Sequence, residues 1–204
     1  MINRPRNWDN VQAYAPKQQL PVGAYVCKIK RAVVQQNTNY GDQLCVLFDI
    51  SDGEYSGFYN DDFQRNTHED KKWKGVLRQF IPVDDGSEND ERTKSAFKGF
   101  VTSVEESNRG YTWNWDERSL AGKEIGIIFR REEWEYNGKS GWTVRPFRAC
   151  SVDTVQDGTY TLPKDKPLKN KSTDSYTDSY NAPNYPAPAA GFTAIDDSDG
   201  ELPF

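Results

Sequence analysis

The residue types that most often carry out catalysis are sparse in this chain. His68 is the one histidine among 204 residues, and it stands in the polar stretch NTHED with no second histidine or cysteine pair nearby. Two aspartate pairs, at 61–62 and 84–85, could hold a metal ion, but both lie beside turn residues, where solvated aspartate is usual. Neither a G-x-x-x-x-G-K-[ST] phosphate loop nor a G-x-S-x-G motif is present. We therefore predict no catalytic residue, metal or cofactor, and expect a binding protein rather than an enzyme.

A denser group of functional side chains lies between residues 129 and 148, where cations are interleaved with aromatic rings. Positive charge follows the phosphates of a single nucleic-acid strand, while the rings stack on its unpaired bases at about 1–3 kcal/mol per base. Duplex DNA does not offer those base faces. Further candidates lie on the expected first strand and in the turn after it. The predicted nucleic-acid-binding residues are Lys28, Lys30, Arg31, Tyr40, Arg130, Arg131, Trp134, Tyr136, Lys139, Trp142, Arg145 and Arg148.

Some aromatic residues in and around this group are equally compatible with a core. Phe129 continues the apolar face of the strand that contains it, and the Arg-Arg-Glu-Glu run at 130–133 also fits a self-neutralising exposed strand. The favoured stacking residues are Trp134, Tyr136 and Trp142, which stand in polar surroundings beside a turn. Trp73 and Phe97 fall on the apolar faces of expected helices, so we interpret them as core.

The segments expected to position these residues are mostly strands. Residues 20–35 alternate apolar and charged side chains, with a phase slip at Lys30–Arg31 that indicates a β-bulge. Residues 43–51 are apolar on nearly both faces, which predicts a central strand, and 58–63 are expected to form a short third strand.

A hairpin is expected at the end of this region. Strands at 123–136 and 142–152 flank an Asn-Gly turn, which is a good short-range hairpin signal. Pro146 restricts its strand to a sheet edge or a bulge.

Two segments show the apolar spacing of helices. Residues 67–80 carry apolar side chains at 73, 76, 77 and 80 behind a start that resembles a capping box, and residues 93–108 repeat the spacing. Three strands, two helices and two strands is the order of a five-stranded OB-fold barrel with one or two helices inserted between strands 3 and 4. We therefore predict a mainly β (α+β) domain over residues 21–162, with a groove formed by one sheet face and the loops between strands 1–2 and 4–5.

Composition and charge change near residue 163. The formal net charge is −5, but 6 of the 31 acidic residues follow Lys171, after which there is no lysine or arginine, so residues 1–171 carry about +1. The final segment is rich in Lys, Ser, Asp, Asn and Pro without an apolar period, and it cannot offset the entropy of ordering. We expect an N-terminal arm (1–20), a flexible linker (163–195) and an acidic tip (196–204).

The cysteines and the start of the chain bear on the cellular compartment. Cys27, Cys45 and Cys150 are an odd, widely spaced set without a C-x-x-C pair, which predicts free thiols in a reducing environment. The first residues lack the apolar core of a signal peptide, and no run approaches the roughly 20 apolar residues of a membrane helix. A cytoplasmic protein without membrane association is the expectation.

Taken together, these parts resemble single-stranded DNA-binding proteins, whose acidic tips end in an apolar-Pro-Phe triplet. IDDSDGELPF is similar to such a tip, with Leu202 at the first apolar place. Over roughly residues 20–80, LPVGAYVCKIKRA…GDQLCVLFDISDGEYSGFYNDDF and WKGVLRQF are similar to the start of a phage family of these proteins. The first-strand pattern of the housekeeping bacterial members is missing, which puts their tetramer in doubt for this chain. The resemblance implies coating of single strands during phage DNA replication, recombination or repair in a bacterial host.

The resemblance also implies that the tip recruits replication or recombination proteins. A terminal ring and carboxylate suit a small apolar pocket with a cation at its rim, and the acids suit a basic surround. A solubilising tail would explain the acids but not the last three residues. The predicted partner-binding residues are Asp196, Asp197, Asp199, Glu201, Leu202, Pro203 and Phe204.

Other functions remain open on the sequence. An RNA-binding OB or cold-shock-like protein would use the same rings and cations, and an adaptor could use the barrel for protein contacts without nucleic acid. A strand-annealing mediator is not distinguished from a passive coat. An oligomer is compatible with the sequence.

Overall fold

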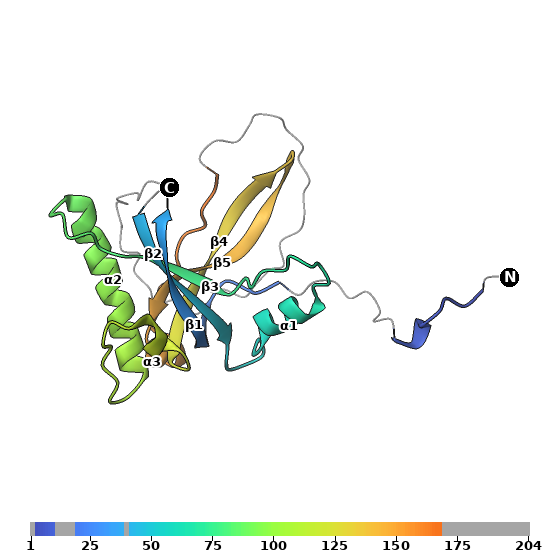
Figure 1. The fold of residues 1–204 in the computed structure, drawn as a ribbon, viewed down its shortest axis with the longest axis horizontal. Helices are drawn as coiled ribbons and strands as arrows, with labels where there is room; N and C mark the ends of the chain where they lie inside the picture. Colours follow the sequence, from blue (N-terminus) through green and yellow to red (C-terminus); the bar gives the residue numbers. More distant parts are fainter. Residues whose placement is uncertain (1–2, 11–18, 39–40, 169–204) are drawn as a thin grey trace, which may run out of the picture. The chain divides into compact units, whose positions relative to one another are not determined.

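The chain folds around one five-stranded sheet (Figure 1). The computed structural model describes residues 3–10, 19–38 and 41–168. Neighbouring strands are antiparallel and follow the order β3-β2-β1-β4-β5. The strands are β1 (Ala24–Thr38), β2 (Gly41–Ile50), β3 (Val76–Phe80), β4 (Glu124–Tyr136) and β5 (Lys139–Cys150). An open, mainly β sheet of five strands is therefore confirmed.

One long helix, α2, and several short ones connect or flank these strands. None of the helices in the described ranges is long and apolar enough to cross a membrane. Between β2 and β3 lies α1, and α2 with the 3-10 helix η2 lies between β3 and β4. The helices are η1 (Trp8–Asn10), α1 (Phe58–Arg65), α2 (Glu88–Ser107), η2 (Glu117–Leu120) and α3 (Val152–Gln156).

The long strand β1 belongs to two ladders. It pairs with β2 over most of its length and with β4 over Ala24–Lys28. The register with β2 shifts between Ile29 and Arg31, which confirms the predicted bulge at Lys30. The pairing of β1 with β4 ends before Ile29. The Ile29 N–H instead donates to the Lys123 carbonyl, and the Ile29 carbonyl accepts from the Gly122 N–H.

The core lies on the inner face of the sheet, and α2 packs against it from the side of β3, β4 and β5. Ala32, Val46 and Leu77 form a buried row across β1, β2 and β3. Phe97, Phe100 and Val104 of α2 belong to the same buried cluster. Phe97 is therefore core, as the sequence predicts.

The prediction of a third strand at 58–63 is wrong, because this segment is α1. Tyr59 and Phe63 are four residues apart, a spacing that also fits a helix face. The buried Asp49 carboxylate accepts hydrogen bonds from the backbone N–H of Tyr59 and of Asn60, at 3.0 and 3.2 Å. This acceptor, distant in sequence, caps the helix start.

The prediction of a helix at 67–80 is also wrong. Residues 71–75 have no helical structure and 76–80 form β3, which pairs with β2. The apolar spacing of Val76, Leu77 and Phe80 fits a strand as well, since Leu77 points into the core while its neighbours face the other way. A single helix of more than one turn, α2, therefore separates β3 from β4 within the described chain.

The remaining sequence predictions of elements are confirmed. The helix expected at 93–108 is α2, which begins earlier because the Ser87 side chain accepts a hydrogen bond from the Asp90 N–H. The hairpin is β4–β5, with Pro146 on the outer strand β5 beside a register shift. All three cysteines are free. Burial raises the pKa of the Cys27 thiol well above its usual range and that of Cys150 to about 11.

Gly75 permits the close approach of β2 to the segment before β3. A Cβ at this position would lie 2.4 Å from the Phe48 carbonyl oxygen and 2.7 Å from the Tyr59 ring. We expect Gly75→Ala to lower the free energy of unfolding by about 1–3 kcal/mol, as overpacking of a core does. The matched control is Gly99→Ala in α2, where a Cβ meets nothing within 4 Å, and it should raise stability by up to about 1 kcal/mol. Urea unfolding of both variants measures the difference, and equal stability of the two would contradict the packing described.

Candidate nucleic-acid interface

Three rows of side chains cross β1, β2 and β3 on the face opposite the core. Residues directly opposite in antiparallel strands share a face, and these rows alternate with the buried row of Ala32. We call them together the outer sheet face. The rows are Arg31–Leu47–Val76, Val33–Cys45–Arg78 and Gln35–Gln43–Phe80.

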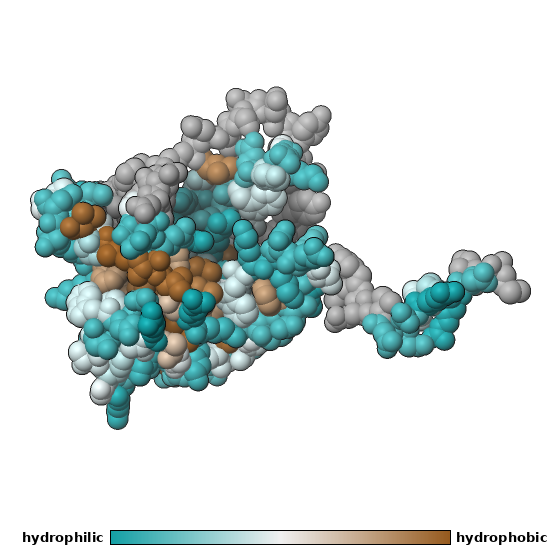
Figure 2. All heavy atoms as spheres, in the orientation of Figure 1, coloured by the Kyte–Doolittle hydropathy of each residue, from teal (hydrophilic) through white to brown (hydrophobic). Residues whose placement is uncertain are grey.

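The outer sheet face combines an apolar floor with exposed cations. Cys45 is buried and Val33, Leu47, Val76 and Phe80 are half-buried, whereas Arg31 and Arg78 are exposed. Figure 2 shows apolar side chains gathered over the region of β1 and β2 next to α2. In the described part of the chain, no ion pair engages either arginine. Both guanidinium groups are available to an anionic ligand.

Two neighbouring aromatic rings, each contacted by a lysine ammonium, lie beside the outer sheet face. Lys30 Nζ lies 4.6 Å from the centroid of the Trp73 ring, and Lys71 Nζ lies 4.5 Å from that of Phe63. The two rings are 5.7 Å apart. The Trp73 indole N–H donates to the Phe48 carbonyl at 2.9 Å, which fixes the ring beside β2. Trp73 is therefore not on a helix as predicted, but it is half-buried and packs against the core, in part as the sequence predicts.

Asp49 connects Lys30 to α1. Its carboxylate is buried and caps the start of α1, and its second oxygen lies 3.6 Å from Lys30 Nζ. Lys30 itself stays partly exposed, so its ammonium remains accessible above Trp73. Lys30 is therefore anchored through Asp49 to α1, the helix that occupies the segment for which the sequence predicts a third strand.

The β4–β5 hairpin distributes the predicted residues over two opposite faces. Trp134 lies opposite Gly141 and Tyr136 opposite Lys139, on the face that also carries Arg130 and Arg145. Arg131 and Trp142 lie on the other face. Trp134 and Trp142 are 37% and 39% exposed and Tyr136 is 72% exposed. The three favoured stacking residues are accessible, but they do not form one platform.

Several hairpin cations already have partners. Arg130 bonds to Glu132 at 2.7 Å and lies over the Phe147 ring. Arg131 lies 4.8 Å from the Trp142 centroid and forms an ion pair with Asp165. Arg145 approaches Glu132 at 4.0 Å. The self-neutralising interpretation of the 130–133 run is therefore correct for Arg130.

Residues 163–168, which the sequence assigns to the linker, contact the hairpin. The Lys166 N–H donates to the Arg131 carbonyl, and the Glu133 N–H donates to the Lys166 carbonyl, both at 2.9 Å. The Leu168 N–H donates to the Glu133 carboxylate at 3.1 Å. The contacts of the folded part thus continue through residue 168, and the predicted linker from 169 onward lies outside the described residues.

The other predicted residues are placed as follows. Lys28 is exposed on β1, and its Cα partners on the neighbouring strands are Asp49 and Glu124. Arg148 is exposed and donates a long bond, 3.5 Å, to the Thr161 carbonyl. Lys139 is exposed beside the hairpin turn. Tyr40 and all seven residues of the tip lie outside the described residues.

Several residues of this interface are not among those predicted from the sequence, and five of them share one cause. Phe63, Lys71, Trp73, Arg78 and Phe80 all fall in the two segments whose secondary structure it assigned wrongly. The alternation of Val76, Arg78 and Phe80 around Leu77 was the available signal.

One aspartate of each pair forms an ion pair with a lysine. Asp62 bonds to Lys74 at 2.8 Å, and Asp84 bonds to Lys94 at 2.6 Å. Within the described ranges, no group of three or more His, Cys, Asp and Glu side chains could hold a metal ion.

In comparisons with known proteins, no protein-family model matches the chain, and a search of curated proteins found no match.

Asp49 is testable as the anchor of this interface. We expect Asp49→Asn to lower the free energy of unfolding by about 1–3 kcal/mol, because the amide NH2 would face backbone donors in a buried site. Asp52→Asn is the control, since this exposed side chain accepts a hydrogen bond from the adjacent Gly53 N–H and from no other group in the described part of the chain. Thermal unfolding of the two variants measures the effect. If Asp49→Asn were as stable as the control, the anchoring role of this carboxylate would be wrong.

Proposed function

We propose that this protein binds single-stranded DNA without sequence specificity, mainly through the outer sheet face. The observation that carries the proposal is the exposure of Arg31 and Arg78 above a half-buried apolar floor, next to the Trp73 and Phe63 rings. Cations along such a groove attract phosphates, and the apolar floor and rings receive unstacked bases.

The arrangement of the strands supports an OB-type barrel. β1 pairs with both β2 and β4, the outer strands β3 and β5 approach each other, and α2 lies between β3 and β4. In OB folds, the face of strands 2 and 3 and the loops 1–2 and 4–5 bind oligonucleotides. The outer sheet face includes β2 and β3, and the Asn137–Gly138 turn is the 4–5 loop.

The hairpin supplies a second, weaker set of contacts. Trp134, Tyr136 and Lys139 lie together near its turn and are exposed enough to stack on bases and to meet a phosphate. Arg130 and Arg131 contribute less because each already has a carboxylate partner. A DNA phosphate must compete with these carboxylates for the two guanidinium groups, and salt weakens the phosphate's attraction by screening it.

The biological role follows from the resemblance of the sequence to phage single-stranded DNA-binding proteins. We infer that the protein coats single strands during DNA replication, recombination or repair. The acidic tip then recruits partner proteins while the folded part holds DNA. This part of the proposal rests on the sequence IDDSDGELPF, which lies outside the described residues.

The first test is a titration of oligo-dT at several salt concentrations. Log affinity should fall linearly with log salt, and Arg31→Ala and Arg78→Ala should each weaken binding and lower that slope by about 1. Arg92→Ala is the control, because Arg92 pairs with Glu88 on α2 away from the outer sheet face. Binding that shows no preference for single strands over duplex would reject the function. Equal slopes for the three variants would reject this face as the site.

A matched RNA strand, added as a competitor, distinguishes an RNA-binding protein from one that prefers single-stranded DNA.

The second test removes the tip. We expect deletion of residues 196–204 to abolish capture of replication or recombination proteins from a phage-infected extract, because the terminal ring and acids are lost. Affinity for oligo-dT should hold or rise, since the acids oppose DNA. A variant with only Phe204→Ala separates the ring from the charge. Unchanged capture by the deletion variant would show that the tip does not recruit.

A further inference from the structure

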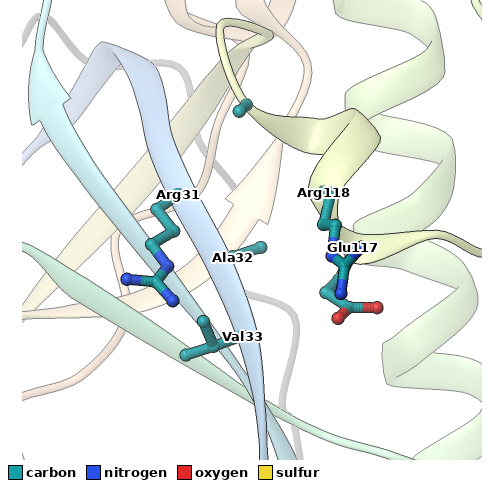
Figure 3. Close-up of a pocket in the computed structure, with 6 residues that line it drawn as sticks. Arg31, Ala32, Val33, Glu117 and Arg118 are labelled. Carbon is teal, nitrogen blue, oxygen red and sulfur yellow. The ribbon is translucent and has the colours of Figure 1, made fainter.

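A pocket of about 240 Å³ lies between β1 and η2 (Figure 3). In Figure 3, Ala32 points from β1 toward η2, and Glu117 and Arg118 extend from η2 on the other side of the space. At the share of about 30 Å³ per water molecule in the liquid, the volume corresponds to about eight waters, which suffices for one heterocyclic base. The pocket is lined by Arg31, Ala32, Val33, Glu117, Arg118 and Ala121.

The pocket follows from the divergence of β1 and β4. β1 pairs with β4 only as far as Lys28, and from Ile29 onward η2 lies beside this edge instead. Among the described residues, no strand pairs with the edge beyond that point. Alternate residues of a ladder direct their N–H and C=O groups away from the partner strand, so the edge presents backbone donors and acceptors toward the pocket.

The loop that forms the far wall is held firmly. The Trp113 indole N–H donates to the Asp116 carbonyl, and the Arg118 N–H donates to the Asp116 carboxylate, both at 2.9 Å. The Trp115 ring stacks on Phe97 of α2 at 6.3 Å with an angle of 12° between the planes, although Trp115 is 72% exposed and has a positive φ of 67°. The wall is therefore preformed rather than assembled by a ligand.

The pocket continues the outer sheet face. Arg31 and Val33 belong to both the outer sheet face and the pocket. A single DNA strand lying on that face would therefore reach the pocket by crossing the edge of β1. Two cations, Arg31 and Arg118, flank a lining that is otherwise apolar except for one carboxylate. This combination suits the phosphates and the base of a nucleotide.

We propose that this pocket holds one unstacked nucleotide of a bound single strand and favours a base with an exocyclic amino group. The inference rests on the proposed function. Arg31 and Arg118 hold the flanking phosphates, and Ala32, Val33 and Ala121 contact the base. The Glu117 carboxylate only accepts hydrogen bonds, so it pairs with the amino groups of cytosine, adenine or guanine, which thymine lacks. The protein then has a base preference at one position within otherwise nonspecific binding.

The experiment compares oligo-dC and oligo-dT of equal length at one salt concentration. Relative to the full-length wild-type chain, Glu117→Ala should weaken oligo-dC binding by about tenfold or more, the lower end of the range for a hydrogen bond to a charged group, and leave oligo-dT binding unchanged or slightly tighter. Arg118→Ala should weaken both strands equally. Glu106→Ala and Arg109→Ala, exposed residues at the end of α2 and after it, are the charge-matched controls and should change neither. Thermal unfolding checks that each variant is folded.

The possible outcomes separate the two proposals. If the wild type binds both strands and Glu117→Ala changes them by the same factor, the pocket does not select a base and the inference is wrong, while the proposed function stands. If the wild type binds neither strand, the proposed function fails and the inference fails with it. A selective loss of oligo-dC affinity in Glu117→Ala, absent from Glu106→Ala, supports the pocket as the site.

Discussion

The double pairing of β1 is the constraint on which the other features depend. β1 pairs with β2 along most of its length but with β4 only as far as Lys28, and the bulge at Lys30, which bends the strand, lies just beyond that point. The bend separates β1 from β4 beyond Lys28, which leaves room for η2 and the pocket. It also changes which residues face outward, since Lys30 and Arg31 both point away from the core while Ala32 resumes the buried row.

The local arrangement of charge matters more here than the total. Residues 1–171 carry about +1, yet Arg31 and Arg78 stand exposed on one face without an ion pair among the described contacts, whereas the hairpin arginines face Glu132 and Asp165. A nearly neutral body therefore still presents an accessible cationic surface, and under the proposed function it would attract a polyanion at short range rather than through a long-range field.

The sequence predicted well those elements whose signal is local. Alternation at 20–35 and 123–136 and the Asn-Gly turn depend on neighbouring residues, so β1, β4, β5 and the cations on them were found. The errors at 58–63 and 67–80 arose where distant partners decide the structure: Asp49 caps α1, and pairing with β2 converts a helical spacing into β3. Arg78 and Phe80 could not be placed on the interface before that pairing was known.

The same distant partners explain why the interface is preformed. Lys30 is held by Asp49 and Trp73 by the Phe48 carbonyl, whereas Arg118 belongs to η2, whose start is capped by the neighbouring Asp116. Groups held in place by buried or backbone partners lose little conformational entropy when a ligand binds, so more of their interaction free energy appears as affinity. The exposed hairpin tip, with Tyr136 and Lys139, lacks such anchoring among the described contacts. Under the proposed function, a bound DNA strand would therefore gain most from the outer sheet face and the β1–η2 edge, and the hairpin would extend the contact.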